Sequence, residues 1–224
     1  MINPNLETIL IAGVLIMCFL VALQMKRYND APWKSVFVAI SIVITGLLSC
    51  DIWFALENGY WGGKSFYGAL FFAPLTFVVV AKLLRIPYSH AMDYCATAGC
   101  LVLGLLKADC MLNGCCKGII LWEAYPGEYV RFPSQALEML CALALMFVSI
   151  WTSRKESCRG RIYPNIMVAY GASRFVLNLF RDDWDRAHDM GIIMPIGNIW
   201  SIGAIGIGII WIFLLKWIDS RNRI

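Results

Sequence analysis

An arginine lies inside an apolar stretch of this sequence. Arg174 belongs to the run IYPNIMVAYGASRFVLNLFRDD, and its nearest charged neighbours are Arg161 and Arg181. A charge at that depth in a membrane segment is costly, so such residues usually face a polar interior. Four polar residues of the run fall within an arc of about 80° on a helix: Tyr170, Arg174, Asn178 and Arg181. This stripe predicts an anion site; the alternative is a structural arginine bonded to a neighbouring helix.

A glycine pair precedes the third apolar run. The sequence from Trp61 to Gly68 reads WGGKSFYG, and Gly63 and Ser65 stand just before the predicted helix. Backbone N–H groups at such a helix start favour an anion such as a phosphate. The alternative is a tight turn in which Trp61 and Tyr67 are interfacial aromatic residues. We include Gly63, Ser65 and Tyr67 among the candidate site residues.

The connection after the fourth apolar run is polar and rich in cysteine. It reads KADCMLNGCCKG from Lys107 and contains Cys110, Cys115 and Cys116. No metal site is predicted, because there is no C-x-x-C pair or nearby histidine and two adjacent cysteines cannot easily ligate one ion. A re-entrant segment that turns at Asn113–Gly114 is favoured, since irregular backbone is tolerated at membrane depth where it lines a cavity. A reactive thiol is the alternative, because the flanking lysines would lower its pKa.

A glutamate stands inside the fifth apolar run. The sequence RFPSQALEML begins at Arg131, and Gln135 and Glu138 share a helix face at positions i and i+3. Glu138 needs a partner at its depth in the membrane, and Arg174 or Lys107 would serve. A role in the anion site and a purely structural clamp between helices are both open readings of this residue.

Composition places the whole chain in the membrane. Hydrophobic residues make up 60% of its 224 residues, whereas soluble domains contain about 45–50%. The net charge of +4 does not indicate nucleic-acid binding, because the basic residues stand at the ends of apolar runs. No motif calls for a cofactor. The first run lacks a basic leader and a small-residue cleavage site, so we interpret it as a retained span.

Seven apolar runs are long enough to cross a bilayer. We predict one all-α, polytopic membrane domain over residues 1–224, with an outer re-entrant or loop segment over 107–134. The predicted transmembrane helices cover residues 8–23, 36–55, 65–84, 89–106, 135–151, 162–180 and 195–217.

Lysine and arginine in the connections predict the orientation. Twelve of them fall on one side: Lys26, Arg27, Lys34, Lys82, Arg85, Arg154, Lys155, Arg159, Arg161, Lys216, Arg221 and Arg223. Six fall on the other: Lys64, Lys107, Lys117, Arg131, Arg181 and Arg186. The richer side is expected to be cytoplasmic. The N-terminus is then outside, the C-terminus is inside, and the polar residues gather toward the outer leaflet.

Several of these motifs together resemble the prolipoprotein diacylglyceryl transferase family. The chain has GG-x-S-F-x-G at Gly62, a basic residue followed by N-G…G after the fourth run, P-S-Q-x-x-E at Pro133 and YG-x-x-R-F-x-x-x-x-F-R at Tyr170. The segment MPIGNIWSIG, from Met194, is similar to the family's M-G-Q-x-x-S start of the last span. The resemblance extends from about Gly62 to Trp200.

The resemblance implies a lipid transfer reaction. The family moves a diacylglyceryl group from phosphatidylglycerol to the lipobox cysteine thiol of a preprolipoprotein, releases glycerol phosphate and leaves a thioether. It therefore implies a phospholipid of the bilayer and an exported lipoprotein precursor as partners, no nucleic acid, and a multi-pass protein of the bacterial cytoplasmic membrane.

The resemblance also implies roles for individual residues. Arg174 matches the family's span-six arginine and would neutralise the leaving phosphate. Lys107 stands where the family has a loop arginine, and would act as a point charge without a bidentate fork. Asn113 matches the loop signature, and three further residues match positions around the lipid head group: Gln135, Glu138 and Arg181.

The chain departs from the family pattern at four positions. The family histidine after S-F is Tyr67, which is a poor base with a reference pKa of about 10 but can hydrogen-bond a phosphate oxygen. The loop glutamate is Cys115, the loop asparagine is Cys110 and the span-six glutamate is Asn178. These departures indicate a divergent member. The alternatives are a related membrane transferase with another acceptor, including another thiol, and a non-catalytic lipid-binding scaffold.

Overall fold

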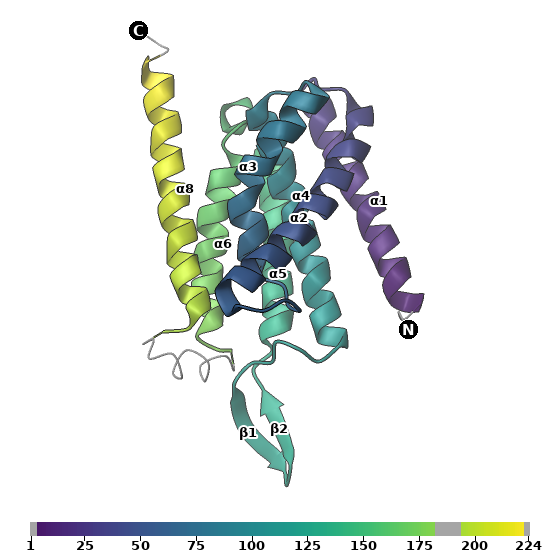
Figure 1. The fold of residues 1–224 in the computed structure, drawn as a ribbon, viewed down its shortest axis with the longest axis vertical. Helices are drawn as coiled ribbons and strands as arrows, with labels where there is room; N and C mark the ends of the chain where they lie inside the picture. Colours follow the sequence, from purple (N-terminus) through teal and green to yellow (C-terminus); the bar gives the residue numbers. More distant parts are fainter. Residues whose placement is uncertain (1–3, 182–193, 222–224) are drawn as a thin grey trace.

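The chain folds into a bundle of long helices with one small hairpin at its end (Figure 1). The computed structural model describes residues 4–181 and 194–221. The long helices are α1 (Pro4–Arg27), α2 (Ser35–Asn58), α3 (Phe66–Leu84), α4 (Tyr88–Leu112), α5 (Ser134–Thr152), α6 (Ile162–Asn178) and α8 (Ile196–Arg221). The shorter elements are the 3-10 turns η1 (Pro32–Lys34) and η2 (Glu156–Cys158) and the strands β1 (Ile120–Tyr125) and β2 (Glu128–Arg131).

Five helical segments in the described part of the chain are long and apolar enough to cross a membrane. They are Pro32–Asn58, Phe66–Leu84, Tyr88–Leu112, Ser134–Thr152 and Ile196–Arg221. Each corresponds to one predicted span, which confirms an all-α membrane protein with several crossing helices. Helices α1 and α6 lie in the same bundle, and successive long helices run in opposite directions (Figure 1).

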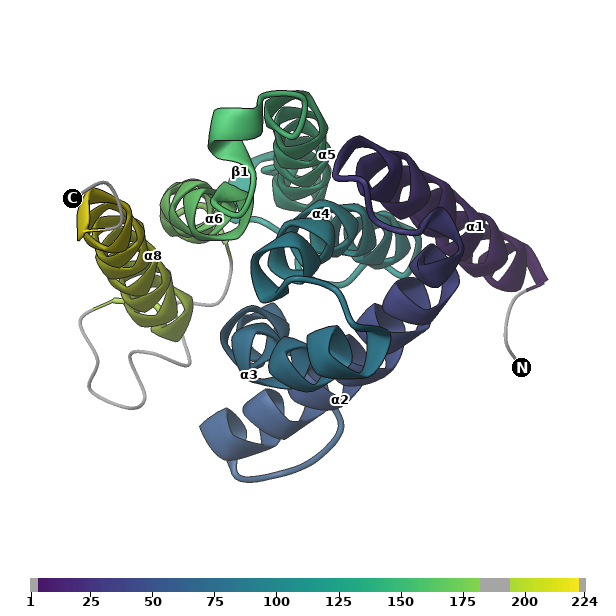
Figure 2. The same ribbon diagram turned by 90° about the horizontal axis from the view of Figure 1, so that it is seen from above.

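Helix α4 forms the centre of the bundle. Seen from above, it is surrounded by α1, α2, α3, α5 and α6, whereas α8 packs on the outer side of α6 (Figure 2). Small residues let the neighbouring backbones approach α4 closely. They include Ala91, Ala96, Ala98 and Gly104. The helix thus has buried side chains on several faces, and residues near its end lie between α5 and α6.

A buried carboxylate fixes the start of α6. Asp93 of α4 accepts hydrogen bonds from the backbone N–H of Gly160 at 2.5 Å and of Ile162 at 2.9 Å. It also accepts the Tyr28 hydroxyl proton at 2.7 Å. The first N–H groups of a helix have no partner within the helix, and Asp93 supplies one from another helix. Arg174 lies twelve residues further along α6, which is about 18 Å.

Glycines permit two close helix contacts. A methyl group on Gly68 of α3 would lie 2.0 Å from the Ser49 carbonyl oxygen of α2. On Gly171 of α6 it would lie 2.9 Å from the Ser201 carbonyl oxygen of α8. Helix pairs in membranes pack closely through such small residues. The second contact brings α8 against the face of α6 beside Arg174.

The predicted outer segment 107–134 divides into three parts. Its first residues continue α4 to Leu112, six residues beyond the predicted span, because the first turn signal is Asn113–Gly114. A loop follows. Strands β1 and β2 then form an antiparallel hairpin whose turn contains Gly127 at φ 84°. The hairpin stands clear of the helices (Figure 1) and β1 is exposed along its length. Lys107 and Cys110 therefore lie on a helix rather than in a loop.

Candidate functional site

Glu138 of α5 is the common partner of three basic side chains. Its carboxylate forms ion pairs with Lys107 of α4 and Arg174 of α6, although the residue is only 5% exposed. A guanidinium nitrogen of Arg181 lies 3.4 Å from the same carboxylate. Both partners that the sequence suggested for Glu138 are present, with Arg181 as a third. One buried carboxylate is thus shared by several basic groups among the described residues.

Four elements bring these charges together. Lys107 reaches the site because α4 continues past the predicted end of its span, and α5 begins at Ser134 just after Pro133. Arg181 follows the end of α6 and pairs with Gly118 in an isolated antiparallel bridge. The Ile119 N–H donates to the Phe180 carbonyl at 3.0 Å in the same contact. The loop before the hairpin therefore ties the end of α6 to the start of α5.

The cluster is suited to an anion. Buried charges are stable only when paired, and among the described residues Lys107 and Arg174 share the one carboxylate of Glu138. This arrangement favours an added negative group. The Nε atom of Arg174 is buried and has no hydrogen-bond partner among the described residues. Guanidinium groups bind phosphate and carboxylate oxygens through several N–H donors at once. The alternative interpretation is a structural arginine that is neutralised by one carboxylate. It does not explain why Lys107 and Arg181 also lie at that carboxylate.

Tyr67 connects α3 to the start of α8. Its hydroxyl donates to the Gly197 carbonyl at 2.8 Å and lies 2.7 Å from the Ser201 hydroxyl. Arg174 and Asn178 flank the same phenol. A phenol has one proton, and in this arrangement that proton is directed to α8. Tyr67 therefore contributes to the site by holding the start of α8 against α3. Ser201 is buried and belongs to the segment MPIGNIWSIG, which resembles the family's start of the last span. We did not select it as a candidate from the sequence.

An apolar cavity of about 410 Å³ adjoins the charged cluster. It lies among α1, α2, α3, α4 and α6, and this volume is in the range of ligand pockets. Its wall is formed almost entirely by apolar atoms. A second cavity of about 10 Å³ is bordered by Glu138 and Arg174. Tyr170 and Leu103 line both cavities, so they separate the apolar space from the charges.

The other predicted residues divide into two groups. Those of the first group lie near Arg174 or hold the nearby loop. Tyr170 and Asn178 are buried near Arg174, and the Tyr170 ring packs on Tyr67 with centroids 6.1 Å apart. Gln135 donates to the Cys115 carbonyl at 2.6 Å, which holds the loop beside the start of α5.

Three candidates have local contacts instead. Gly63 lies under the Phe54 ring, where an added methyl group would come within 2.4 Å of ring carbons. The Ser65 N–H donates to the Cys50 carbonyl at 3.1 Å, and the serine makes no side-chain cap for α3. Asn113 is exposed and donates to Asp109 at 2.8 Å. Their recorded contacts do not include the basic residues of the cluster.

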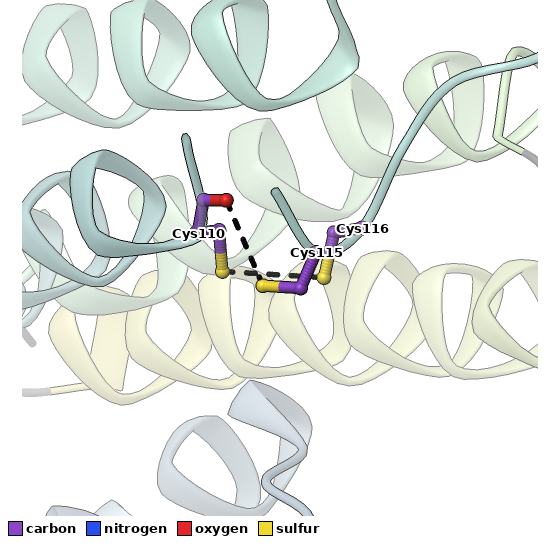
Figure 3. A group of neighbouring side chains, drawn as sticks. All are labelled: Cys110, Cys115 and Cys116. Atoms are coloured by element: carbon purple, nitrogen blue, oxygen red, sulfur yellow. Dashed lines mark hydrogen bonds between the residues drawn. The ribbon is translucent and has the colours of Figure 1, made fainter. Parts of the chain in front are cut away.

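Cys110, Cys115 and Cys116 lie next to the basic cluster. Their sulfur atoms all lie within 4.8 Å of one another (Figure 3). A hydrogen bond from the Cys110 thiol, together with the nearby charges of Lys107 and Arg181, lowers the pKa of Cys116 below its usual value. The sequence suggested that two adjacent cysteines cannot easily ligate one ion. In the structure their sulfur atoms nevertheless lie close together, and Cys116 adopts a left-handed backbone conformation with φ 57°.

Known proteins with similar sequences carry a consistent description. The family model described as prolipoprotein diacylglyceryl transferase matches residues 8–214. A phosphatidylglycerol–prolipoprotein diacylglyceryl transferase of Polaromonas naphthalenivorans is 28% identical over 174 residues, covering 72% of this chain and 62% of that protein. One of Acinetobacter baumannii is 25% identical over 210 residues, covering 83% and 75%. One of Geobacter sulfurreducens is 28% identical over 162 residues, covering 65% and 62%. The chain thus spans less than two thirds of the first and third relatives.

Proposed function

Because this chain belongs to the prolipoprotein diacylglyceryl transferase family, we propose that it transfers diacylglyceryl from phosphatidylglycerol to a cysteine thiol of an exported lipoprotein precursor. The observation that carries the proposal is the buried cluster of Lys107, Arg174 and Arg181 around Glu138, beside a large apolar cavity. A phospholipid has the matching pair of parts, a phosphate and two acyl chains.

The basic cluster supplies the phosphate site of this proposal. The lipid phosphate approaches Arg174 and Lys107 and displaces part of their contact with Glu138, with Arg181 nearby. As the bond between the phosphate and the diacylglyceryl group breaks, negative charge grows on the departing phosphate oxygen. Fixed cations in a site from which water is excluded stabilise such a charge more strongly than water does.

The apolar cavity supplies the acyl-chain site. Its lining is apolar, and only the shared walls at Tyr170 and Leu103 stand between it and the smaller cavity beside Arg174. An acyl chain in this cavity would hold the glycerol backbone near those two residues and the phosphate near Arg174. Orientation of this kind is a substantial part of the rate in reactions between two bound substrates.

The transfer step balances without a cofactor. The acceptor sulfur forms a bond to the terminal glycerol carbon of the diacylglyceryl group, and the bond from that carbon to the phosphate oxygen breaks. The products are a thioether and glycerol phosphate, and the thiol proton is released. In this scheme Tyr67 positions Arg174 and the start of α8, while Asn178 and Gln135 support the walls of the site. Gly63, Ser65 and Asn113 shape the turns around it.

The proposal includes seven membrane crossings. Helices α1 and α6 would cross together with the five apolar segments, which fits their place in the bundle and the alternating directions of the helices. The bias of lysine and arginine supports an outer N-terminus and a cytoplasmic C-terminus. The basic cluster and the hairpin then face the outer half of a bacterial cytoplasmic membrane, where an exported peptide arrives.

A defined transfer assay tests this function. The purified chain is placed in liposomes that contain phosphatidylglycerol and is supplied with a lipobox peptide. We expect a peptide mass increase equal to one diacylglyceryl group, with an equal amount of glycerol phosphate. A peptide with serine in place of the cysteine serves as the acceptor control. Arg174→Ala should bind little lipid phosphate and give no product.

The outcomes separate the competing functions. Full activity of a folded Arg174→Ala variant would contradict the proposed phosphate site. Glycerol phosphate release that requires a different thiol would identify another acceptor. Phosphatidylglycerol binding without turnover, in a protein that elutes as a single species, would identify a non-catalytic lipid-binding scaffold. Complementation of a transferase-depleted strain by the wild type and not by Arg174→Ala would extend the result to cells.

A further inference from the structure

Three free thiol groups converge where α4 ends. Cys110 lies in the last turns of the helix, and Cys115 and Cys116 lie in the loop that follows (Figure 3). Their sulfur atoms are all within 4.8 Å of one another, and those of Cys110 and Cys116 are 4.0 Å apart. None of the three forms a disulfide. Cys115 is exposed and the other two are half-buried, so a solute can reach the group.

The backbone conformation explains how two adjacent cysteines can direct their thiol groups toward Cys110. Gly114 and Cys116 both adopt left-handed conformations, at φ 64° and 57°. For a residue with a side chain this conformation is uncommon and costs energy. The Cys115 N–H donates back to the Cys110 carbonyl at 3.1 Å, which folds the loop over the end of α4. The strained turn thus brings together thiols that an extended chain would keep apart.

We propose that Cys110, Cys115 and Cys116 form a three-thiolate binding site for a soft monovalent metal ion, with Cu(I) as the matching ion. Soft thiolate ligands select Cu(I), zinc and iron–sulfur centres among biological metals. No histidine or carboxylate joins the three sulfurs in the group found among the described residues. The set therefore offers three soft ligands, which suits a three-coordinate ion better than zinc, which usually takes four ligands.

The sulfur positions nearly meet this geometry. Three sulfurs in a plane around one ion, with metal–sulfur bonds of about 2.3 Å, stand about 4.0 Å apart. The Cys110 and Cys116 sulfurs are already at this separation. Cys115 is exposed, so a rotation of its side chain can bring its sulfur closer without moving packed residues. Binding would release the thiol protons and add no other reactant.

The charged residues around the three cysteines are opposite in sign to the expected charge of the metal-bound site. Three thiolates and one monovalent ion carry a net charge of −2, and Lys107 and Arg181 act electrostatically on Cys116. The loop is also held from α5, because Ser134 donates to the Cys116 carbonyl at 3.0 Å and Gln135 donates to the Cys115 carbonyl. The loop thus contacts α5 at Ser134, four residues before Glu138. A bound ion would join this loop to the end of α4.

Metal titration of the purified full chain tests the site. Under anaerobic, reducing conditions, Cu(I) is offered in competition with a coloured Cu(I) chelator, and Zn²⁺ is offered in a parallel series. We expect one Cu(I) per chain and weaker Zn²⁺ binding. Each of Cys110→Ser, Cys115→Ser and Cys116→Ser should weaken Cu(I) binding by more than the roughly 10–100-fold that outer-shell changes cost. X-ray absorption should report three sulfur neighbours.

The test includes a matched control variant and outcomes that would overturn the proposal. Cys158→Ser changes a half-buried cysteine of η2, in the connection between α5 and α6, and should leave Cu(I) binding unchanged. That connection and the end of α4 lie at opposite ends of the bundle (Figure 1). Because Cys115 is exposed, Cys115→Ser keeps the test informative even where another variant unfolds. Cu(I) binding that survives in the triple variant, absence of binding, or Zn²⁺ binding as tight as Cu(I) would each overturn the proposal. This result is independent of transferase activity.

Discussion

The guanidinium group of Arg174 on α6 and the carboxylate of Glu138 on α5 form an ion pair beside the smaller cavity. That cavity measures about 10 Å³, which is about the space of one water molecule. A phosphate therefore cannot enter without a change in this pair. In the function proposed above, Glu138 holds the cations together in the absence of lipid and releases part of that contact when the substrate binds.

Replacement of Glu138 by glutamine should destabilise the protein. The isosteric amide removes the counter-charge that Lys107 and Arg174 share, and removal of one partner from such a buried group costs about 3–5 kcal/mol of the free energy of unfolding. Added glycerol phosphate should restore part of the loss, because an anion that binds only the folded state stabilises it. Thermal unfolding in detergent measures both effects.

The control for this change is Glu156→Gln. Glu156 forms an exposed pair with Arg159, three residues away, and surface pairs of this kind contribute about 0–1 kcal/mol. Equal stability losses for the two variants would contradict the central role of Glu138 in the cluster.

Arg174→Lys should separate charge from geometry. Lysine keeps the positive charge but has no planar fork for two phosphate oxygens. We expect transfer to fall by about 10²–10³-fold, the range found when one stabilising donor is removed from a transition state. The turnover rate in the liposome assay is the measurement. A lysine variant as active as the wild type would show that only charge matters at this position.

Filling the apolar cavity should impair the use of lipid. Gly99 lines the cavity, and a methyl group placed on it meets nothing within 4 Å, so Gly99→Leu projects into open space. We expect a higher KM for phosphatidylglycerol with little loss of stability. Gly206→Leu is the matched control, because Gly206 is exposed, has the same free space and does not line the cavity. Similar kinetics for the two variants would argue against an acyl chain in this cavity.

Gly68→Ala should weaken the contact between α2 and α3. The new methyl group would stand 2.0 Å from the Ser49 carbonyl oxygen, so the helices must move apart. Overpacking of this type costs about 1–3 kcal/mol. Gly206→Ala, which meets no neighbour, should be neutral or stabilising, because alanine favours a helix over glycine by about 1 kcal/mol. Comparison of the two unfolding temperatures checks the prediction.

The sequence by itself determined the local features of this protein. Apolar runs of sufficient length predict the membrane helices, because a bilayer permits few other structures. The helical period placed Tyr170, Arg174 and Asn178 on one stripe, and the depth of Glu138 required a basic partner. The motif order also pointed to the family. The part at 182–193, which includes predicted outer residues such as Arg186, lies outside the described residues.

Only the tertiary structure decided which distant residues meet. Lys107, Arg174 and Arg181 share one carboxylate because α4 continues to Leu112 and the Gly118 bridge holds the end of α6. Periodicity fixes the face of a residue on its own helix, whereas the packing of other helices fixes its distance from their side chains. The convergence of three cysteines is a further case, because it depends on the left-handed backbone at Cys116.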